Sequence, residues 1–512
     1  MMVSSSKKPF HYQQVVLVIL DGWGHREDNQ HNAIAQAKTP FFDSLWKNSP
    51  HSLLGASQHH VGLPSGVIGN SEIGHMTIGT GKTIDTDLVR ISKAMRNNEF
   101  SEITAFKQLF AHIKKHNSSL HVLGMVSPAG VHSHQEHLHG FLKAAKDAGL
   151  TKVIIHAFTD GRDSPPRENH KYLEELEKVI EDLGIGYIAT ATGRYFAMDR
   201  DKNWHRTEKA EKALFEGEGR KVKAQKPSQI LNKLHKEGEM DEYLEPIIFL
   251  DETGQSFPIS DNDGIFFFNY RIDRPRQLSY KIMERAKKQN LFFATMTEYD
   301  PRLESVVAFP PTKIDASLAE EVSEAGLSQA RIAETEKYGH ITYYFNGGQA
   351  ILHKNEEHFL IDSHRDVATH DQAPEMRATE IADKAVESLE KGVNFIALNF
   401  ANADMVGHTA NVPAIIKAAE TVDANLKRIV EKAKQKNAAV LITADHGNAE
   451  INLDAERGVT HTAHTTNPVP AILTVDGIKL RDGTLADIAP TILELFNLPK
   501  PTSMTGESLI QN

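Results

Sequence analysis

The feature that most constrains the fold of this chain is a series of short apolar runs that alternate with helical patterns. Runs such as VVLVIL (15–20) and FIALNF (395–400) have the length of buried β-strands. Stretches such as 134–150 and 414–436 instead repeat apolar residues at the spacing of an amphipathic helix. Strands that alternate with helices in this way predict an α/β fold with mainly parallel sheets.

Carboxylates and histidines follow one group of these runs or lie close to them. Asp21 comes directly after 15–20, and Asp445-His446 come directly after AVLITA (439–444). The whole group consists of Asp21, Asp404, His408, Asp445, His446 and His464. Because ligands of parallel sheets bind beyond the carboxyl ends of the strands, we expect these side chains to lie close together.

The chemistry of this group favours a divalent metal. The chain has no cysteine, and mixed carboxylate and imidazole ligands suit a hard-to-borderline ion. Six ligands exceed what one catalytic zinc uses, whereas a two-metal site, which serves in-line phosphoryl displacement, would use them all. Any one of these residues alone is more often a turn former, a helix cap or a structural histidine. The metal interpretation therefore rests on the set.

Cations or histidine follow a second group of runs in the middle of the chain. Those nearest the predicted strand ends are His132, Arg162, Arg194 and Arg271. Arginine offers a planar fork that matches phosphate and carboxylate, so several arginines at strand ends indicate a small, doubly anionic substrate. The formal net charge of −11 argues against general nucleic-acid binding.

The order of the two groups predicts one domain inserted into another. The carboxylate group lies before about residue 85 and after about residue 315, and the cationic group lies between these positions. We expect a discontinuous metal-binding domain of residues 1–85 and 315–512. An inserted substrate-binding domain would span residues 86–314, and the cleft between the two domains would be the active site.

Two linkers would join these domains. We place them near KTIDTD (82–87) and VVAFPPTKI (306–314). Pro310-Pro311 would stiffen the second linker. Two connections of this kind would permit a hinge motion.

Glycines surround a single serine in VIGNSEIGHMTIGTG (67–81). The stretch has neither the GxxxxGK[ST] pattern of a nucleotide-binding P-loop nor the Gly-x-Ser-x-Gly pattern of a nucleophile elbow. A serine hydroxyl is a poor nucleophile at neutral pH unless a base or a metal activates it. We interpret Ser71 as a metal-activated nucleophile, with the alternative that it caps a helix.

Composition bears on where such a protein would work. The absence of cysteine favours a reducing, cytoplasmic setting. The N-terminal stretch MMVSSSKKPFHYQQ lacks the apolar core of a signal peptide, and no apolar run approaches the length of a membrane span. We therefore expect a cytoplasmic protein with no membrane partner.

Ten stretches, taken together and in order, resemble the cofactor-independent phosphoglycerate mutases, a metal-dependent class of the alkaline phosphatase superfamily. They are LDGWG, GNSEIGH, SPAGVHSH, DGRDSPP, TGRYFAMDRD, NYRIDR, ETEKYGH, NADMVGHT, TADHGN and AHTTNPVP. The resemblance implies interconversion of 3-phosphoglycerate and 2-phosphoglycerate in glycolysis and gluconeogenesis, without 2,3-bisphosphoglycerate as cofactor. It also implies a monomer in which a transferase domain is inserted into an alkaline phosphatase-like domain.

The resemblance further implies a role for each site residue. One manganese ion would be held by Asp404, His408 and His464. The other would be held by Asp21, Ser71, Asp445 and His446. The residues that would contact or act on the substrate are His132, Arg162, Asp163, Arg194, Arg200, Arg271, Arg274 and Lys337. Ser71 would carry the phosphoryl group, and Asp163 would be the general acid and base.

Two other classes of function stay open at this point. One is a different metal-dependent phosphatase, sulfatase or phosphomutase of the same superfamily, against which the arginine-rich insert argues. The other is a metal-binding protein without catalytic activity. Release of free phosphate from 3-phosphoglycerate would indicate the first, and metal binding without turnover would indicate the second.

Overall fold

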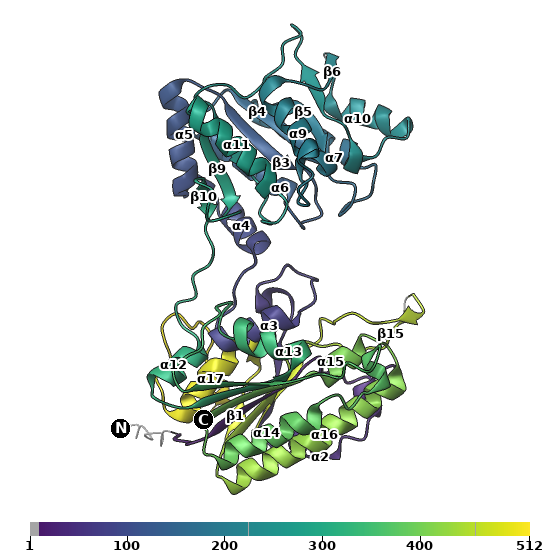
Figure 1. Cartoon of the computed structure of the whole chain (residues 1–512), viewed down its shortest axis with the longest axis vertical. Coiled ribbons are helices and arrows are strands. Elements are labelled where there is room, and N and C mark those ends of the chain that lie inside the picture. The colour runs from purple at the N-terminus through teal and green to yellow at the C-terminus, as the bar shows by residue number, and fades with distance from the viewer. Residues whose placement is uncertain (1–9, 224, 456, 512) are drawn as a thin grey trace, which may run out of the picture. The chain divides into compact units, whose positions relative to one another are not determined.

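The computed structural model of the chain describes residues 10–223, 225–455 and 457–511. The chain forms two compact units (Figure 1). Unit 1 comprises Met1–Asp85 and Lys313–Asn512, and unit 2 comprises Thr86–Thr312. The divisions expected from the sequence fall after residues 85 and 314.

Unit 1 is built on an eight-stranded sheet. In spatial order its strands are β12 (Glu356–Ile361), β11 (Gln329–Glu334), β13 (Phe395–Phe400), β1 (Val15–Leu20), β14 (Ala439–Thr443), β17 (Val469–Leu473), β2 (His51–Gly55) and β19 (Gly483–Thr484). The first five strands run parallel, and β17 is antiparallel to both of its neighbours. Every residue of β1, β13 and β14 is buried, which explains why these strands read as continuous apolar runs.

Helices cover both faces of this sheet. On one face lie α2 (Pro40–Asn48), α14 (Ala378–Glu390) and α16 (Val412–Gln435), and on the other lie α3 (Ser71–Thr80) and α17 (Ile488–Phe496) (Figure 1). The apolar side of α16 recurs at helical spacing through Ile415, Ala419, Val422 and Leu426, all of which are buried. The helices cover the faces of the sheet but not its carboxyl edge, where the loops that follow the parallel strands lie.

Unit 2 is built on a second eight-stranded sheet, parallel except where β5 meets β7. Its spatial order is β10 (Val306–Phe309), β9 (Phe292–Thr297), β8 (Gly264–Phe267), β3 (Leu120–Met125), β4 (Val153–Thr159), β5 (Tyr187–Gly193), β7 (Ile247–Leu250) and β6 (Arg220–Lys223). Phe266 and Phe267 of β8 enter separate apolar cores, because successive strand residues point to opposite faces. Both sheets confirm the predicted α/β class.

Helices also flank both faces of the sheet in unit 2. One core is closed by α4 (Asp87–Arg96), α5 (Thr104–His116), α6 (Gln135–Asp147), α7 (Asn169–Leu183) and α10 (Pro227–Lys236). The other core is closed by α9 (Trp204–Glu216) and α11 (Arg276–Gln289). One sequence-based detail is wrong: residues 306–309 were assigned to a linker, but they form β10 and pair with β9.

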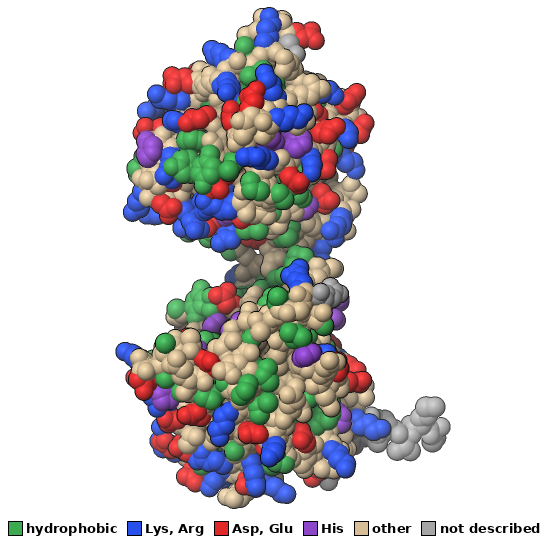
Figure 2. All heavy atoms as spheres, turned by 90° about the vertical axis from the view of Figure 1, so that its right-hand side faces the viewer, with side chains coloured by type: hydrophobic (Ala, Val, Ile, Leu, Met, Phe, Trp, Pro, Cys, Tyr) green, Lys and Arg blue, Asp and Glu red, His purple; other side chains and the backbone are tan. Residues whose placement is uncertain are grey.

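No helix among residues 10–223, 225–455 and 457–511 has both the length and the apolar character needed to cross a membrane. On the face shown in Figure 2, Lys and Arg side chains are interspersed with Asp and Glu side chains.

Candidate functional site

Ser71 is the first residue of α3, at the carboxyl edge of the sheet in unit 1. The helix is capped by Asn70, whose Oδ1 accepts a hydrogen bond from the Ile73 amide at 3.0 Å. The alternative that Ser71 itself is the cap is therefore wrong. Its hydroxyl oxygen instead lies 2.9 Å from His446 Nε2 and 2.8 Å from Lys337 Nζ.

Lys337 reaches this point from the five-residue helix α13 (Thr335–Gly339), and it is only 3% exposed. Its ammonium group donates to Asp21 Oδ1 at 2.8 Å and to Asp404 Oδ2 at 2.6 Å, as well as to Ser71. Burial alone would lower the pKa of Lys337, but the carboxylates of Asp21 and Asp404 outweigh burial and raise the pKa. Lys337 is therefore a permanent cation beside the serine hydroxyl.

Asp404, His408 and His464 form a compact triangle of possible metal ligands. Asp404 lies in the short helix α15 (Asn402–Gly407), and its Oδ1 is 3.3 Å from His408 Nε2 and 3.1 Å from His464 Nε2. Each ring donates its Nδ1–H to a backbone carbonyl, at 2.7 Å for His408 and 2.8 Å for His464. Both Nε2 atoms are thereby left to bind a cation.

A second group of ligand atoms comes from Asp21, Asp445 and His446, all fully buried. His446 Nε2 lies 3.5 Å from Asp21 Oδ1 and 3.6 Å from Asp445 Oδ2. Asp445 Oδ2 receives no well-directed hydrogen bond within the described part of the chain. A buried carboxylate oxygen of this kind is costly unless a cation compensates it.

The donor set therefore fits divalent metal ions. It combines carboxylate oxygens with imidazole nitrogens, and it lacks sulfur, as a hard-to-borderline ion prefers. We call these eight residues the acid–histidine cluster: Asp21, Ser71, Lys337, Asp404, His408, Asp445, His446 and His464. The structure brings all seven predicted metal ligands together, and it adds Lys337, which the sequence analysis had grouped with the substrate residues.

The remaining predicted substrate residues gather in unit 2, and we call them the arginine cluster: His132, Arg162, Asp163, Arg194, Arg200, Arg271 and Arg274. Burial lowers the pKa of Arg274, and the guanidinium groups of Arg194 and Arg200 lower it further. Burial also lowers the pKa of His132 to about 4, with Arg194 adding to the effect. These mutual effects require the cations to lie close together, as recognition of a multiply charged anion demands.

Carboxylates that the sequence analysis did not select hold these cations in place. Asp160 is fully buried and accepts from Arg194 Nη1 at 2.5 Å and from Ser127 Oγ at 2.7 Å. Asp273 lies 2.6 Å from Arg200 Nη1 and 3.6 Å from His132 Nδ1. Arg194 and Arg200 are thus oriented before any ligand binds.

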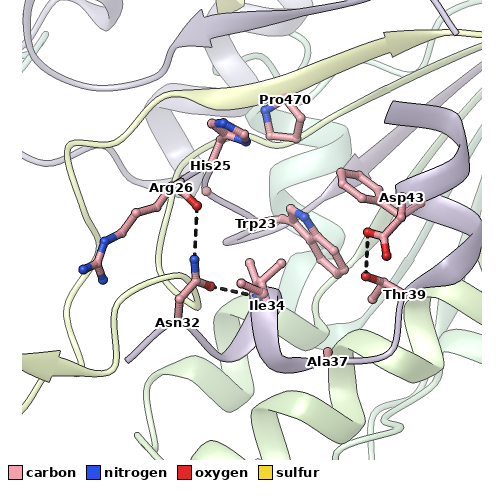
Figure 3. A pocket seen from close by; sticks show the side chains of 12 residues that line it. Trp23, His25, Arg26, Asn32, Ile34, Ala37, Thr39, Asp43 and Pro470 are labelled. Atoms are coloured by element: carbon pink, nitrogen blue, oxygen red, sulfur yellow. Dashed lines mark hydrogen bonds between the residues drawn. The ribbon is translucent and has the colours of Figure 1, made fainter. Parts of the chain in front are cut away.

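A separate cavity of about 110 Å³ lies beside the segment that follows Asp21 (Figure 3). Its polar side chains are already engaged: Asn32 Nδ2 donates to the Arg26 carbonyl at 3.3 Å, and Thr39 Oγ1 donates to Asp43 at 3.2 Å. No member of the acid–histidine cluster lines it. The cavity is therefore not part of the site.

Comparison with known proteins places the chain in a family. The chain matches the Metalloenzyme superfamily over residues 13–500. It is 46% identical over 508 residues to the 2,3-bisphosphoglycerate-independent phosphoglycerate mutase of Listeria innocua, covering 97% of this chain and 99% of that protein. This chain belongs to the 2,3-bisphosphoglycerate-independent phosphoglycerate mutases. The protein of the same name from Clostridium botulinum (strain Langeland) is 45% identical over 516 residues, covering 99% of this chain and all of that protein.

A solved structure points to the same family. The phosphoglycerate mutase of Leishmania mexicana, determined at low cobalt concentration, has a TM-score of 0.58 and 28% identity, with 99% of both chains covered. The resemblance stated from the ten sequence stretches is thus confirmed.

Several site residues of this mutase escaped sequence reasoning from the residues themselves. Lys337 lies in a helix too short to show periodicity. Asp160 directly follows β4, and this position after a strand was the signal that could have identified it. Asn399, which donates to Asp21 Oδ2 at 2.7 Å, lies within an apolar run and gave no signal.

Proposed function

We propose that this chain interconverts 3-phosphoglycerate and 2-phosphoglycerate through a phosphoserine intermediate on Ser71. The observation that carries the proposal is the surroundings of the Ser71 hydroxyl, which contacts a buried ammonium and a histidine among three buried carboxylates. Family membership supports the choice of reaction, because curated relatives named for this activity align over nearly the whole chain.

The arginine cluster would bind the phosphate and the carboxylate of the substrate. Arg194 is only 2% exposed and is oriented by Asp160, so it offers a preorganised fork. His132, with a pKa of about 4, is neutral at physiological pH and serves as a hydrogen-bonding group. Ser71 belongs to unit 1 and these cations to unit 2, so transfer requires both units to act on one substrate molecule.

The acid–histidine cluster would supply the nucleophile. Two divalent ions held by the seven predicted ligands would lower the pKa of the serine hydroxyl and offset charge on the transferring phosphoryl group. The Lys337 ammonium, 2.8 Å from Ser71 Oγ, stabilises negative charge on that oxygen. The N-terminus of α3 favours the phosphorylated serine as well.

The reaction would proceed in two balanced displacements. Ser71 Oγ attacks phosphorus as the alkoxide, the bond between phosphorus and the glycerate oxygen breaks, and that oxygen takes a proton from Asp163. Glycerate then turns within the site, and its other hydroxyl attacks the phosphoserine while Asp163 accepts the proton. Ser71 Oγ leaves as the alkoxide from which the cycle began. Water must be excluded between the two steps, because hydrolysis of the phosphoserine would turn the mutase into a phosphatase.

We further propose manganese as the ion, a monomeric assembly and a cytoplasmic location. The oxygen and nitrogen ligands support manganese but also suit related divalent ions. The absence of cysteine supports a reducing compartment. We propose no nucleic-acid or membrane partner and no requirement for 2,3-bisphosphoglycerate.

The decisive experiment is an enolase-coupled assay on chelator-treated protein. It is run with 3-phosphoglycerate and without 2,3-bisphosphoglycerate, and Mn²⁺ is then added back. We expect activity to return with the metal and a phosphopeptide to be trapped at Ser71. Release of free phosphate would indicate a phosphatase instead, and metal binding without turnover would indicate a non-catalytic protein.

A matched pair of variants sharpens this test. Ser71→Ala should lower kcat by about 10⁴-fold or more, because it removes the nucleophile. Thr77→Ala, on the same helix, removes a hydroxyl that donates only to the Ile73 carbonyl and should leave kcat unchanged. Equal activity of the two variants would exclude Ser71 as the carrier.

A further inference from the structure

Two fully buried side chains to which the proposed reaction gives no role lie against its central residues. They are His75, one helical turn after Ser71 in α3, and Asn399, in β13. Neither was selected from the sequence. Their contacts link three members of the acid–histidine cluster.

The hydrogen bonds of His75 determine which of its nitrogens carries the proton. Nδ1 lies 2.9 Å from the backbone carbonyl oxygen of Ser71, which can only accept. Nδ1 is therefore the donor to Ser71, and this nitrogen also lies 3.1 Å from Asp445 Oδ2, as an ion-pair contact rather than a well-directed hydrogen bond. Although Asp21, His75 and Asp445 lie close enough to share an ion, a protonated Nδ1 cannot be a ligand.

Asn399 completes the arrangement from the neighbouring strand. Its Nδ2 donates to Asp21 Oδ2 at 2.7 Å and lies 3.0 Å from His75 Nε2. The opposite orientation of the amide would place its oxygen against the Asp21 carboxylate, where the two acceptors would repel. With its proton on Nδ1, the neutral ring of His75 has Nε2 free to accept, so the two assignments agree.

We propose that His75 and Asn399 form a positioning pair that fixes Asp21, Asp445 and the Ser71 backbone relative to one another. The pair runs from the Asp21 carboxylate through the Asn399 amide and the His75 ring to Asp445 and Ser71. It contacts no reacting atom. This inference rests on the proposed metal-dependent function. It explains how Asp21 after β1, Asp445 beyond β14 and Ser71 in α3 keep fixed distances from one another.

Close packing around the pair supports this role. Gly74, next to His75, lies so near the end of β14 that a Cβ there would be 2.6 Å from the Asp445 carbonyl oxygen. The helix thus approaches the strand end at backbone contact, and His75 has little room to adopt another rotamer. A rigid arrangement of this kind preserves ligand geometry when an ion binds or leaves.

The first test measures the Mn²⁺ affinity of metal-free protein by titration calorimetry. Asn399→Leu removes the amide donor, and His75→Gln removes the donor at the Nδ1 position. We expect both to weaken Mn²⁺ binding by about 10- to 100-fold. His75→Asn, which restores an N–H near the Nδ1 position, should recover part of that loss.

The matched control is His156→Gln in unit 2. His156 is as buried as His75 and bonds to His121 and Thr190, far in sequence from every predicted ligand. It should leave Mn²⁺ affinity unchanged even if it lowers the unfolding temperature. Affinities of Asn399→Leu and His75→Gln within twofold of wild type would overturn the positioning pair alone, whereas absence of Mn²⁺ binding by wild type would overturn the proposed function with it.

A second measurement needs no variant. Nitrogen-15 NMR of the metal-free wild-type protein should show His75 as the neutral tautomer with its proton on Nδ1. The tautomer with its proton on Nε2 would overturn the proposal, because neither the Ser71 carbonyl nor the Asn399 amide would then have its partner.

Discussion

The Nε2 atoms of His408 and His464 lie 3.2 Å apart, while each ring donates its Nδ1–H to a backbone carbonyl. Two lone pairs that face each other at this distance repel unless a proton or a metal ion lies between them. Protons and metal ions therefore compete for the same two nitrogens.

This competition predicts the pH dependence of metal binding. The Asp404 carboxylate raises the pKa of His408, and for His464 burial lowers the pKa but Asp404 outweighs burial and raises it. A raised pKa keeps the protonated form to higher pH, so Mn²⁺ affinity should fall as the pH drops from about 8 to about 6. Calorimetric titration with Mn²⁺ across this pH range measures the affinity. Excess Mn²⁺ should restore the activity that is lost in mild acid. An affinity that is flat over this range would contradict the prediction.

Replacement of Lys337 by methionine should destabilise the metal-free protein by about 3 kcal/mol, because Asp21 and Asp404 would stay buried without their cation. Bound Mn²⁺ would supply the missing charge, so the rise in unfolding temperature on adding metal should be larger for Lys337→Met than for wild type. Lys384→Met is the control, since Lys384 pairs with Glu387 at the surface of α14 at 2.5 Å. Equal metal-induced shifts in wild type and Lys337→Met would argue against this electrostatic role.

Asp160→Asn should raise the KM for phosphoglycerate by about 10- to 100-fold, because Arg194 would lose a charged partner. Asp160 Oδ1 also accepts a hydrogen bond from the Asp163 amide at 3.0 Å. The substitution should therefore also loosen the loop that carries Asp163. Mn²⁺ affinity should not change, because every predicted metal ligand lies in unit 1. Asp300→Asn, which removes a carboxylate paired with Arg302 in the same unit, should leave KM unchanged.

His132 should stay neutral from about pH 5 to about pH 8. Burial and the Arg194 guanidinium lower its pKa to about 4, so its proton is lost well below this range. Acidification to about pH 5 therefore adds no charge to the arginine cluster through His132. Nitrogen-15 NMR of the imidazole measures this directly, and a ring that titrates near pH 6.5 would show that the neighbouring cations do not act on it.

The strands that position the site could be predicted from the sequence because they are buried on both faces. VVLVIL and FIALNF coincide with β1 and β13 residue for residue, since a fully buried parallel strand has no polar side to interrupt it. β10 was missed because its four residues precede Pro310-Pro311, which reads as a linker. Edge strands of this length have too few buried residues to show a pattern.

The metal ligands could be predicted from the sequence for a related reason, whereas the residues that support them could not. Asp21 directly follows β1 and Asp445 follows β14 after one intervening residue, so their place in the chain predicts their place in space. Asn399 lies inside a strand and Asp273 lies in an arginine-rich loop, so neither position distinguishes a supporting side chain from an ordinary one. Their roles depend on which atoms they meet across the fold, and sequence spacing does not give that.

The position of β1 in its sheet also has a consequence for folding while the chain is being synthesised. β1 ends at Leu20, yet its neighbours β13 and β14 begin at Phe395 and Ala439. At roughly 5–20 residues per second, a ribosome would need on the order of 20 to 80 seconds to reach the first of them. Throughout that interval VVLVIL is an unpaired apolar segment on a nascent chain, while unit 2 is synthesised and can fold. We expect this segment to be a binding site for chaperones during translation.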